Sequence, residues 1–469
     1  MFEHLDEVLI PPDSTVEQAM QHIDQTAHRT DGVGVVFVVD TDRSLLGVLT
    51  DGDIRRSLLA GANLETRVSE VMNPSPTVAP IGASPHLLLR LFDNRLKQIP
   101  VVDEDGSVVD LLLYSRFSVV PSGTPLLIRA KAPVRLSFAG GGTDLTRHFG
   151  NGGGAVVSAT IDRYCQATLL RRNDRRITIR SLDLDQYVEL DSLDEVQYDG
   201  TLDLIKAAIR VVRPQFGFDL TTESDVPPGT GLGGSSSMAV AVVSVLYRLV
   251  EGELEEYRIA DLAYQAERVE LGILGGWQDQ YAAAFGGFNF MEFTPGNVLV
   301  HPLRISDRVR LELESNLLIC FTGRTRDSGE LHTADQGSRL ETDRSAELHH
   351  RMLELAQETR DALLTGQMLR FGHLLNEAWE TKKRYGGHIT NDRVDDLHAV
   401  ARANGAIGGK LLGAGGGGYL LFYCDPLQRH RTIEALAAEG AENIGFQFDE
   451  RGVRVWRSEH IGGEPDCTP

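Results

Sequence analysis

Residues 227–237, Pro227-Pro-Gly-Thr-Gly-Leu-Gly-Gly-Ser-Ser-Ser237, lead directly into an apolar run, 238–250, that is long enough for a buried helix. Glycines let main-chain amides approach an anion closely, and the first turn of a helix offers unpaired N–H donors at the positive end of its dipole. The three serines add hydroxyl groups that can cap the helix or bind a metal ion. The stretch therefore predicts a phosphate-binding loop, whose kind depends on its surroundings.

Two common kinds of phosphate loop do not fit these surroundings. Gly229, Gly231 and Gly234 have the G-x-G-x-x-G spacing of a dinucleotide site, but that loop follows a fully buried parallel strand. Here the preceding segment, 218–226, alternates apolar and polar residues, and two prolines separate it from the glycines. No Gly-Lys-Ser/Thr follows, which excludes a Walker A loop. A tight turn before a core helix would explain one or two glycines; four glycines with three serines favour a functional loop.

Length and composition limit the remaining possibilities. A chain of 469 residues predicts two or three domains, and 42% apolar with 24% charged residues is typical of globular protein. The net charge of −21 argues against nucleic acid or a membrane surface as partner, although local cations can still bind a small anionic substrate. The four cysteines form no C-x-x-C pair, which favours neither zinc nor disulfides. We expect no membrane association and a cytoplasmic location, because no signal-peptide core or membrane-spanning run is present.

The first 122 residues contain an internal repeat. Each copy has a helical pattern followed by two short apolar strands that a polar turn separates. The helical patterns are 15–28 and 84–96, and the strand pairs are 35–40 with 45–50 and 99–103 with 108–113. The repeat predicts an α/β module, residues 1–122, in which the two copies bury their strands together.

This module resembles the tandem cystathionine-β-synthase-type (CBS) regulatory pair. In that family, a Thr or Ser and an Asp after the second strand hold the ribose of an adenine nucleotide, and Thr50 and Asp53 match that pattern. The resemblance implies one site for AMP, ADP or ATP, because Leu113 and Arg116 occupy the matching positions of the second copy. A packing or dimerisation module without a ligand is the alternative. Since CBS modules pair between chains, the resemblance also implies a homodimer.

A second set of patterns lies beyond a linker at about 121–125. An alternating segment, 126–138, predicts a strand that runs into the turn 139–145. Helical patterns follow at 202–212, 253–271, 343–365 and 367–384, and a second glycine-rich stretch, 410–418, runs into an apolar strand.

The stretches 133–144, 227–237 and 410–418 resemble, in order, the three motifs of the GHMP small-molecule kinases, over about residues 126–460. Phe-Ala-Gly-Gly-Gly-Thr-Asp-Leu at 138–145 and Gly-Gly-Trp-Gln-Asp-Gln-Tyr at 275–281 are similar to the branch that acts on D-glycero-D-manno-heptose 7-phosphate. The resemblance implies an α+β, two-lobed GHMP kinase fold that follows the α/β CBS pair. The implied lobes are 126–310, which binds ATP, and 311–465, with the active site in the cleft between them.

The resemblance also implies ATP, Mg²⁺ and a set of site residues. The triphosphate loop would comprise Pro228, Gly229, Gly231, Leu232, Gly233, Gly234, Ser235, Ser236 and Ser237. Ser235 and Glu267 would approach Mg²⁺, which needs few protein ligands, with Glu270 as the fallback carboxylate.

Two residues match the positions next to the transferred phosphoryl group. Asp279 would act on the acceptor hydroxyl, either as general base or by orienting and polarising it; a helix N-cap is its structural alternative. Arg135 would lie near the transferring phosphate; its alternative is a solvated charge on a strand.

Asp144 would bind sugar hydroxyls, or else stabilise its turn. A substrate that is already phosphorylated needs further cations, and the end of a charged helix is the alternative interpretation for Lys383. The remaining candidates for substrate binding are Gly141, Gly142, Thr143, Arg324, Arg326, Lys382, Lys383, Gly415, Gly416 and Gly417.

The implied activity is transfer of the γ-phosphate of ATP to the anomeric hydroxyl of a sugar. D-glycero-D-manno-heptose 7-phosphate, which would give the 1,7-bisphosphate, is the substrate that the resemblance favours. A kinase for a deoxyhexose or hexosamine and a non-catalytic nucleotide and sugar sensor are the alternatives. Retention of Ser235, Glu267 and Asp279 argues against the sensor.

Overall fold

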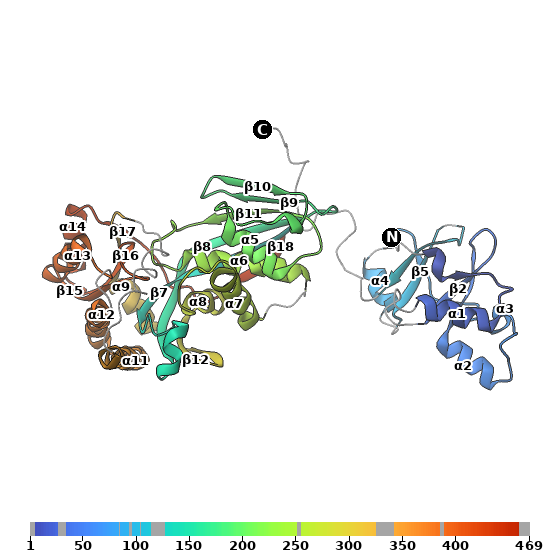
Figure 1. Cartoon of the computed structure of the whole chain (residues 1–469), viewed down its shortest axis with the longest axis horizontal. Coiled ribbons are helices and arrows are strands. Elements are labelled where there is room, and N and C mark those ends of the chain that lie inside the picture. The colour runs from blue at the N-terminus through green and yellow to red at the C-terminus, as the bar shows by residue number, and fades with distance from the viewer. Residues whose placement is uncertain are drawn as a thin grey trace. The chain divides into compact units, whose positions relative to one another are not determined.

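A computed structural model describes residues 5–26, 34–83, 85–92, 96–103, 105–113, 127–250, 255–324, 342–384 and 389–458. The chain forms two compact units, Met1–Thr124 and Pro125–Pro469 (Figure 1). Each unit has its own sheets and its own buried core. No helix among the described residues is long and apolar enough to cross a membrane.

The first unit repeats one small sheet twice. In each copy a short strand runs parallel to the next one, which then pairs antiparallel with the third. The strands are β1 (Leu9–Ile10), β2 (Val35–Val39) and β3 (Leu45–Thr50), then β4 (Ala79–Pro80), β5 (Gln98–Val102) and β6 (Val108–Leu113). The helices are η1 (Leu5–Val8), α1 (Val16–Thr26), α2 (Asp51–Leu59), α3 (Val68–Val71) and α4 (Pro85–Phe92). Phe37 of the first copy packs with Leu111 and Leu113 of the second, so the copies share a core.

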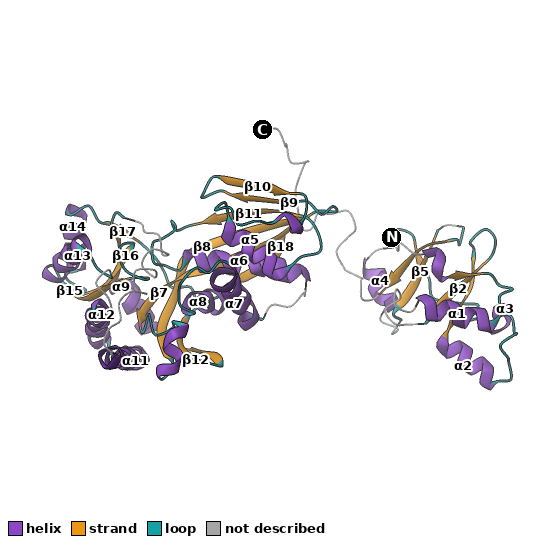
Figure 2. Ribbon diagram, in the orientation of Figure 1, coloured by secondary structure: helices purple, strands orange, loops and turns teal. Residues whose placement is uncertain are grey.

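The second unit is built on an eight-stranded sheet (Figure 2), and the first half of its central strand, β8, is buried on both faces. One edge of β8 pairs with β7, and the other pairs with β12 and then β11. The strands are β7 (Leu127–Ala139), β8 (Gly154–Arg171), β9 (Ile177–Ser181), β10 (Gln186–Leu190), β11 (Phe218–Ser224), β12 (Phe288–Thr294), β13 (Asn297–Pro302) and β18 (Arg454–Ser458).

Helix α6 (Gly234–Val250) packs against β7 and β8, and its residues 236–247 are buried, in keeping with the apolar residues that this part of the helix has on all sides. Helix α8 packs against the same two strands and against α6. The other elements of this part are η4 (Thr146–Asn151), η5 (Leu193–Glu195), α5 (Asp203–Val212), α7 (Glu256–Tyr264), η6 (Gln265–Glu270) and α8 (Gln278–Phe285).

A four-stranded antiparallel sheet, with the order β15-β16-β14-β17, forms the rest of the second unit. Its strands are β14 (Leu317–Phe321), β15 (Ala406–Leu411), β16 (Tyr419–Cys424) and β17 (Glu442–Ile444). Its helices are α9 (Asp307–Asn316), α11 (Thr342–Thr365), α12 (Met368–Lys383), α13 (Asp392–Ala403) and α14 (Arg429–Ala438). The last strand, β18, returns to pair with β7, so the predicted lobe 311–465 contributes a strand to the sheet of 126–310.

Candidate active site

The loop between β11 and α6 takes a backbone path that requires glycine. Gly229, Gly231 and Gly233 have φ values of +72°, +84° and +80°, in the left-handed region that other residues adopt at a cost. The amide of Arg135 donates to the carbonyl of Leu232, at 3.0 Å, and ties the loop to β7. Helix α6 begins immediately afterwards, so the loop and the positive end of a helix dipole lie together.

Arg135 and Asp279 form an ion pair beside this loop. Arg135 Nη2 lies 2.7 Å from Asp279 Oδ1, and Arg135 Nη1 donates to the carbonyl of Gly231 at 2.5 Å. The Arg135 side chain is 4% exposed and that of Asp279 is 18% exposed, so only the carboxylate reaches solvent appreciably. A Cβ at Gly233 would lie 3.5 Å from both side chains. Loop, guanidinium and carboxylate therefore meet at one point.

Both alternatives for these two residues disagree with the geometry. The N-cap of α8 is Trp277, and Asp279 is the second residue of the helix with its side chain on Arg135, so Asp279 is no N-cap. Arg135 is buried rather than a solvated strand charge.

Glu267 lies on a π-helical turn, η6, that continues α7 where the sequence pattern predicted an uninterrupted α-helix. π-turns often occur at functional sites, since the wider turn moves a side chain out of helical register. Glu267 is 2% exposed, and its two carboxylate oxygens accept from Ser235 Oγ (2.7 Å) and Ser236 Oγ (2.6 Å). Gln280 Nε2 donates to Oε2 at 2.7 Å, and Arg268 Nη1 lies 3.4 Å from Oε1.

This arrangement fits a hard divalent cation. Ser235 is exposed at the start of α6, and its hydroxyl and Glu267 Oε1 are oxygen donors side by side, which suits Mg²⁺ with its remaining ligands from water and phosphate. The described residues contain no cluster of three or more His, Cys, Asp or Glu side chains that could hold a metal by itself. The fallback carboxylate, Glu270, accepts from Tyr198 at 2.8 Å and lies 3.6 Å from Arg210, away from the serines.

The last loop serine has a different position from the first. Ser237 Oγ donates to the carbonyl of Pro133 at 2.9 Å, and its amide donates to the carbonyl of Gly233. Both donors are therefore already engaged, and Ser237 joins α6 to β7.

Asp144 and Thr143 hold the turn after β7. Asp144 is 2% exposed, and its carboxylate accepts from the amides of Gly142 (2.9 Å) and Gln278 (3.2 Å) and from Gln278 Nε2 (3.1 Å). This geometry agrees with the turn-stabilising alternative, and Asp144 also caps the first amide of α8. Thr143 Oγ1, which is buried, donates to the carbonyls of Gly140 and Ala155. Gly141 and Gly142 are half-buried above them.

The second glycine loop packs on the first, backbone against backbone. A Cβ at Gly413 would lie 2.5 Å from the Cα of Gly231, and one at Gly418 would lie 2.3 Å from the carbonyl oxygen of Thr230. Lys382 Nζ donates to the carbonyl of Gly413. These close approaches explain why Gly231, Gly413 and Gly418 have no side chains.

The tip of this second loop is fixed from two sides. The Gly416 amide donates to the carbonyl of Ile389, Asn391 Nδ2 donates to the carbonyl of Gly416, and a Cβ at Gly415 would clash with Ile389. A Cβ at Gly417 would lie 3.1 Å from the Arg324 carbonyl oxygen, and that carbonyl also accepts from Gly418.

The predicted phosphate-binding cations differ in availability. The Arg324 side chain is exposed and forms no ion pair with any residue that the structure describes. Lys383 Nζ lies 2.9 Å from Glu380 and 3.8 Å from Asp395, which agrees with the helix-end alternative. Arg326 lies outside the described residues.

Three polar residues at the site were not predicted from the sequence. Gln280 and Arg268 surround Glu267, as described above. Lys410, at the start of the third motif, is 3% exposed and donates from β15 to the carbonyls of Ser137 (2.7 Å) and Phe138 (3.2 Å) on β7. The available signal was a lysine directly before the apolar and glycine residues of the third motif.

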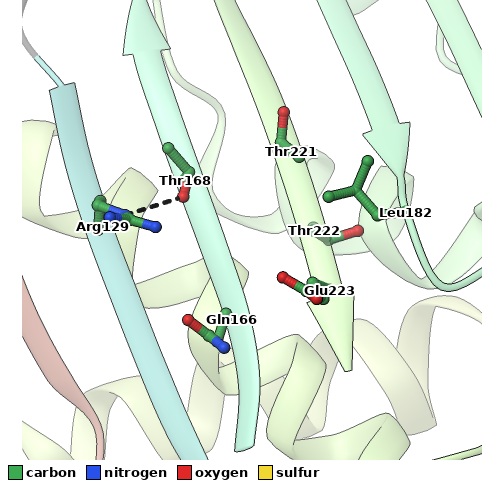
Figure 3. A pocket seen from close by; sticks show the side chains of 7 residues that line it. All are labelled: Arg129, Gln166, Thr168, Leu182, Thr221, Thr222 and Glu223. Carbon is green, nitrogen blue, oxygen red and sulfur yellow. Dashed lines mark hydrogen bonds between the residues drawn. The ribbon is translucent and has the colours of Figure 1, made fainter. Parts of the chain in front are cut away.

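A separate hollow of about 210 Å³ lies at the other end of the large sheet (Figure 3). Figure 3 shows the Arg129 side chain donating to Thr168, at 3.3 Å, with Glu223 on the next strand but one. Arg129 is exposed whereas its neighbour Ile128 is buried, so the hollow is on the outer side of these strands. None of the residues around Asp279 lines it.

In the first unit, Thr50 and Asp53 bond to each other. Asp53 Oδ2 accepts from the amide and hydroxyl of Thr50, at 3.0 and 2.5 Å, and the Asp53 amide donates to Thr50 Oγ1. The pair is the capping box of α2, and Arg56 lies 2.6 Å from Asp53 Oδ1. Leu113 ends β6, and Arg116 lies outside the described residues.

Models of known protein families match stretches of both units. Models of the GHMP kinases N terminal domain and of the GHMP kinases C terminal match residues 203–287 and 359–442, and the CBS domain model matches 4–60 and 68–116. The D-glycero-alpha-D-manno-heptose 7-phosphate kinase of Campylobacter jejuni is 39% identical over 336 residues, which cover 70% of this chain and 99% of that protein.

Two further relatives are similar over about two thirds of this chain or more. A crystal structure of a D-glycero-D-manno-heptose 1-phosphate kinase from Bacteriodes thetaiotaomicron has 34% identity and a TM-score of 0.59, and the match covers 70% of this chain and 98% of that one. The bifunctional fucokinase/GDP-fucose pyrophosphorylase of Arabidopsis thaliana is 29% identical over 338 residues, 68% of this chain and 32% of that protein.

Proposed function

The chain belongs to the GHMP kinases, which use ATP, and we propose that it phosphorylates the anomeric hydroxyl of D-glycero-D-manno-heptose 7-phosphate to give the 1,7-bisphosphate. The observation that carries this choice is the 39% identity with a heptose 7-phosphate kinase over 99% of that protein. The meeting of Arg135, Asp279 and the glycine loop at one point supports catalysis rather than sensing.

In the proposed reaction the sugar hydroxyl lies against Asp279, on the side of Gly233 where the γ-phosphate arrives. The hydroxyl oxygen bonds to the γ-phosphorus as the bond to the β–γ bridging oxygen of ATP breaks; the hydroxyl proton passes to Asp279 Oδ2, and ADP leaves. Arg135 holds Asp279 by Oδ1, so the other carboxylate oxygen is available to the substrate. The amides of the loop and the N-terminus of α6 stabilise charge on the phosphates.

Mg²⁺ would be held by Ser235 Oγ and Glu267 Oε1, where it would neutralise phosphate charge. Gln280 and Ser236 bind the other oxygen of Glu267, so they would orient its carboxylate toward Ser235.

For the phosphate that the substrate already carries, we propose Arg324 with Lys382. Arg324 is exposed beside the second glycine loop, and Lys382 binds that loop at Gly413. A guanidinium suits a phosphate dianion because it donates two parallel hydrogen bonds.

Turnover with defined sugars tests the proposal. ADP release should occur with D-glycero-D-manno-heptose 7-phosphate and exceed by far that with heptose 1-phosphate, the sugar in the name of the Bacteriodes structure. Absence of turnover across hexoses, deoxyhexoses and both heptose phosphates would refute the kinase proposal. Preference for L-fucose would instead support the deoxyhexose alternative, which the similarity to the fucokinase favours.

For the first unit we propose adenine-nucleotide binding at Thr50 and Asp53, with an effect on kinase activity or on pairing of two chains. The capping box places both polar side chains at the N-terminus of α2, the positive end of the helix dipole. Calorimetric titration of the full chain with AMP, at ATP concentrations that fill the kinase site, tests this. Heat that persists in Thr50→Val would refute these residues as ligands, and no heat would leave a packing module.

A further inference from the structure

We propose that Lys410 is a positioning residue for phosphoryl transfer: it holds the Ser137–Phe138 backbone beside Arg135 and adds a positive charge that an anion in the active site compensates. The inference deepens the proposed function and rests on it for the reaction, but it is carried by the surroundings of Lys410 itself.

Lys410 links two sheets at the active site. It lies on β15, the strand that leads into the second glycine loop, and its ammonium donates to two consecutive carbonyls of β7. Arg135 lies two residues before Ser137 on the same strand. The side chain therefore fixes the strand that carries Arg135 relative to the loop that packs on Gly231.

The charge of Lys410 lacks a protein counter-ion. No carboxylate among the described residues forms an ion pair with it, and the charged groups that act on it are two more cations, Lys382 on α12 and Arg135 on β7. Burial, followed by these two cations, holds the pKa of Lys410 well below its ordinary value. Arg135 is paired with Asp279, whereas the partners of the Lys410 ammonium among the described residues are two backbone carbonyls.

An ammonium without a counter-ion is costly to bury, so stability does not explain it. Lys206 shows the usual solution: it is 1% exposed but lies 2.6 Å from Asp199 and 3.8 Å from Asp203. The uncompensated positive charge of Lys410 is suited to a phosphoryl group, whose oxygens carry negative charge throughout transfer. In a site that excludes water, such a charge acts without direct contact.

The test compares Lys410→Met with Lys206→Met in the full chain. Lys410→Met keeps the apolar stem and should lower kcat about 10- to 100-fold, with the KM for ATP changed less than about threefold. Its Tm without ligands should equal or exceed that of the unchanged protein. Lys206→Met, which leaves Asp199 without its partner, should lower Tm and keep kcat.

Lys410→Gln separates charge from hydrogen bonding, because its amide can still donate to a carbonyl. We expect kcat to fall about tenfold or more, because the charge is lost, but less than in Lys410→Met, which loses the hydrogen bonds as well. Full activity of Lys410→Gln, or a kcat of Lys410→Met within about threefold of the unchanged protein, would overturn the proposal. A fall in Tm for Lys410→Met as large as that for Lys206→Met would also overturn it, because Lys410 would then serve folding stability like an ordinary paired lysine. If the protein without substitutions shows no turnover, the kinase proposal is refuted instead. The Tm comparison would then still test whether the charge of Lys410 is unpaired.

Discussion

Arg135 and Asp279, which are 144 residues apart in the sequence, form an ion pair of 2.7 Å directly below Gly233. The pair joins β7 to α8, and it leaves one oxygen of Asp279 free of the guanidinium. The position of Asp279 therefore depends on Arg135. In the proposed reaction, the approach of a phosphate to both depends on Gly233, which has no side chain.

Replacing Asp279 by asparagine should remove the proton acceptor while keeping a partner for Arg135. We expect kcat to fall by about 10²- to 10⁴-fold, the range for loss of a general base, with ATP affinity retained. Turnover assays and calorimetric titration with a non-hydrolysable ATP analogue measure the two effects. Asp261→Asn is the control and should keep kcat. Asp261 lies on α7, and its carboxylate accepts from Tyr281, which is on α8 like Asp279. Full activity of Asp279→Asn would favour an orienting role.

A methyl group at Gly233 should impair catalysis more than folding. Its Cβ would meet Arg135 and Asp279 at 3.5 Å, which is ordinary contact, so the cost to stability is that of φ +80°, about 1–2 kcal/mol. The same methyl group would occupy the space where the phosphate has to approach. Gly272→Ala controls for backbone strain, since Gly272 has φ +66° and no atom within 4 Å. Equal loss of kcat in both variants would contradict this interpretation.

The motifs in the sequence predicted the elements and the gathering of the site better than they predicted individual roles. The resemblance to the GHMP kinases placed Arg135, the glycine loop and Asp279 in three motifs, and the structure brings them together. Asp144 was expected to bind sugar hydroxyls, yet its carboxylate is occupied by backbone amides and Gln278, which no spacing reveals. The role of Lys410 was not predicted, because burial without a counter-ion depends on neighbours that are distant in the sequence.

The two candidate carboxylates for Mg²⁺ can be distinguished by metal affinity. Glu267→Gln should weaken binding of Mn²⁺, used as a spectroscopic substitute in the presence of ADP, by about tenfold or more, because a charged oxygen donor is lost. Glu270→Gln should leave it unchanged, since Glu270 bonds to Tyr198 instead. Electron paramagnetic resonance titration of free Mn²⁺ gives both values without turnover. The reverse order would move the metal to Glu270.

Charge removal at Arg324 tests the site for the phosphate of the sugar. Arg324→Ala should raise the KM for heptose 7-phosphate about tenfold or more, the loss expected for one charge-assisted bidentate pair, and should change the KM for ATP little. Lys383→Ala, at a lysine already paired with Glu380 and Asp395, should have a smaller effect. If Arg324→Ala leaves the sugar KM unchanged, an unphosphorylated sugar becomes the better substrate.

The unpaired charge of Lys410 should also appear in the pH dependence of stability. Because burial lowers the pKa of Lys410 in the folded protein, the unfolded chain binds a proton between that lowered pKa and the ordinary value of 10.5. Below this window, the buried charge lowers the free energy of unfolding by its full amount. As the pH rises through the window, the free energy of unfolding recovers by up to about 1.4 kcal/mol per pH unit. Lys410→Met has no such group, so its advantage in the free energy of unfolding over the unchanged protein should be largest at low pH and shrink toward pH 10.5. Urea unfolding of both proteins without ligands, at several pH values from 6 upward, measures the difference. A difference in the free energy of unfolding that does not change with pH would show that folding does not lower the pKa of Lys410.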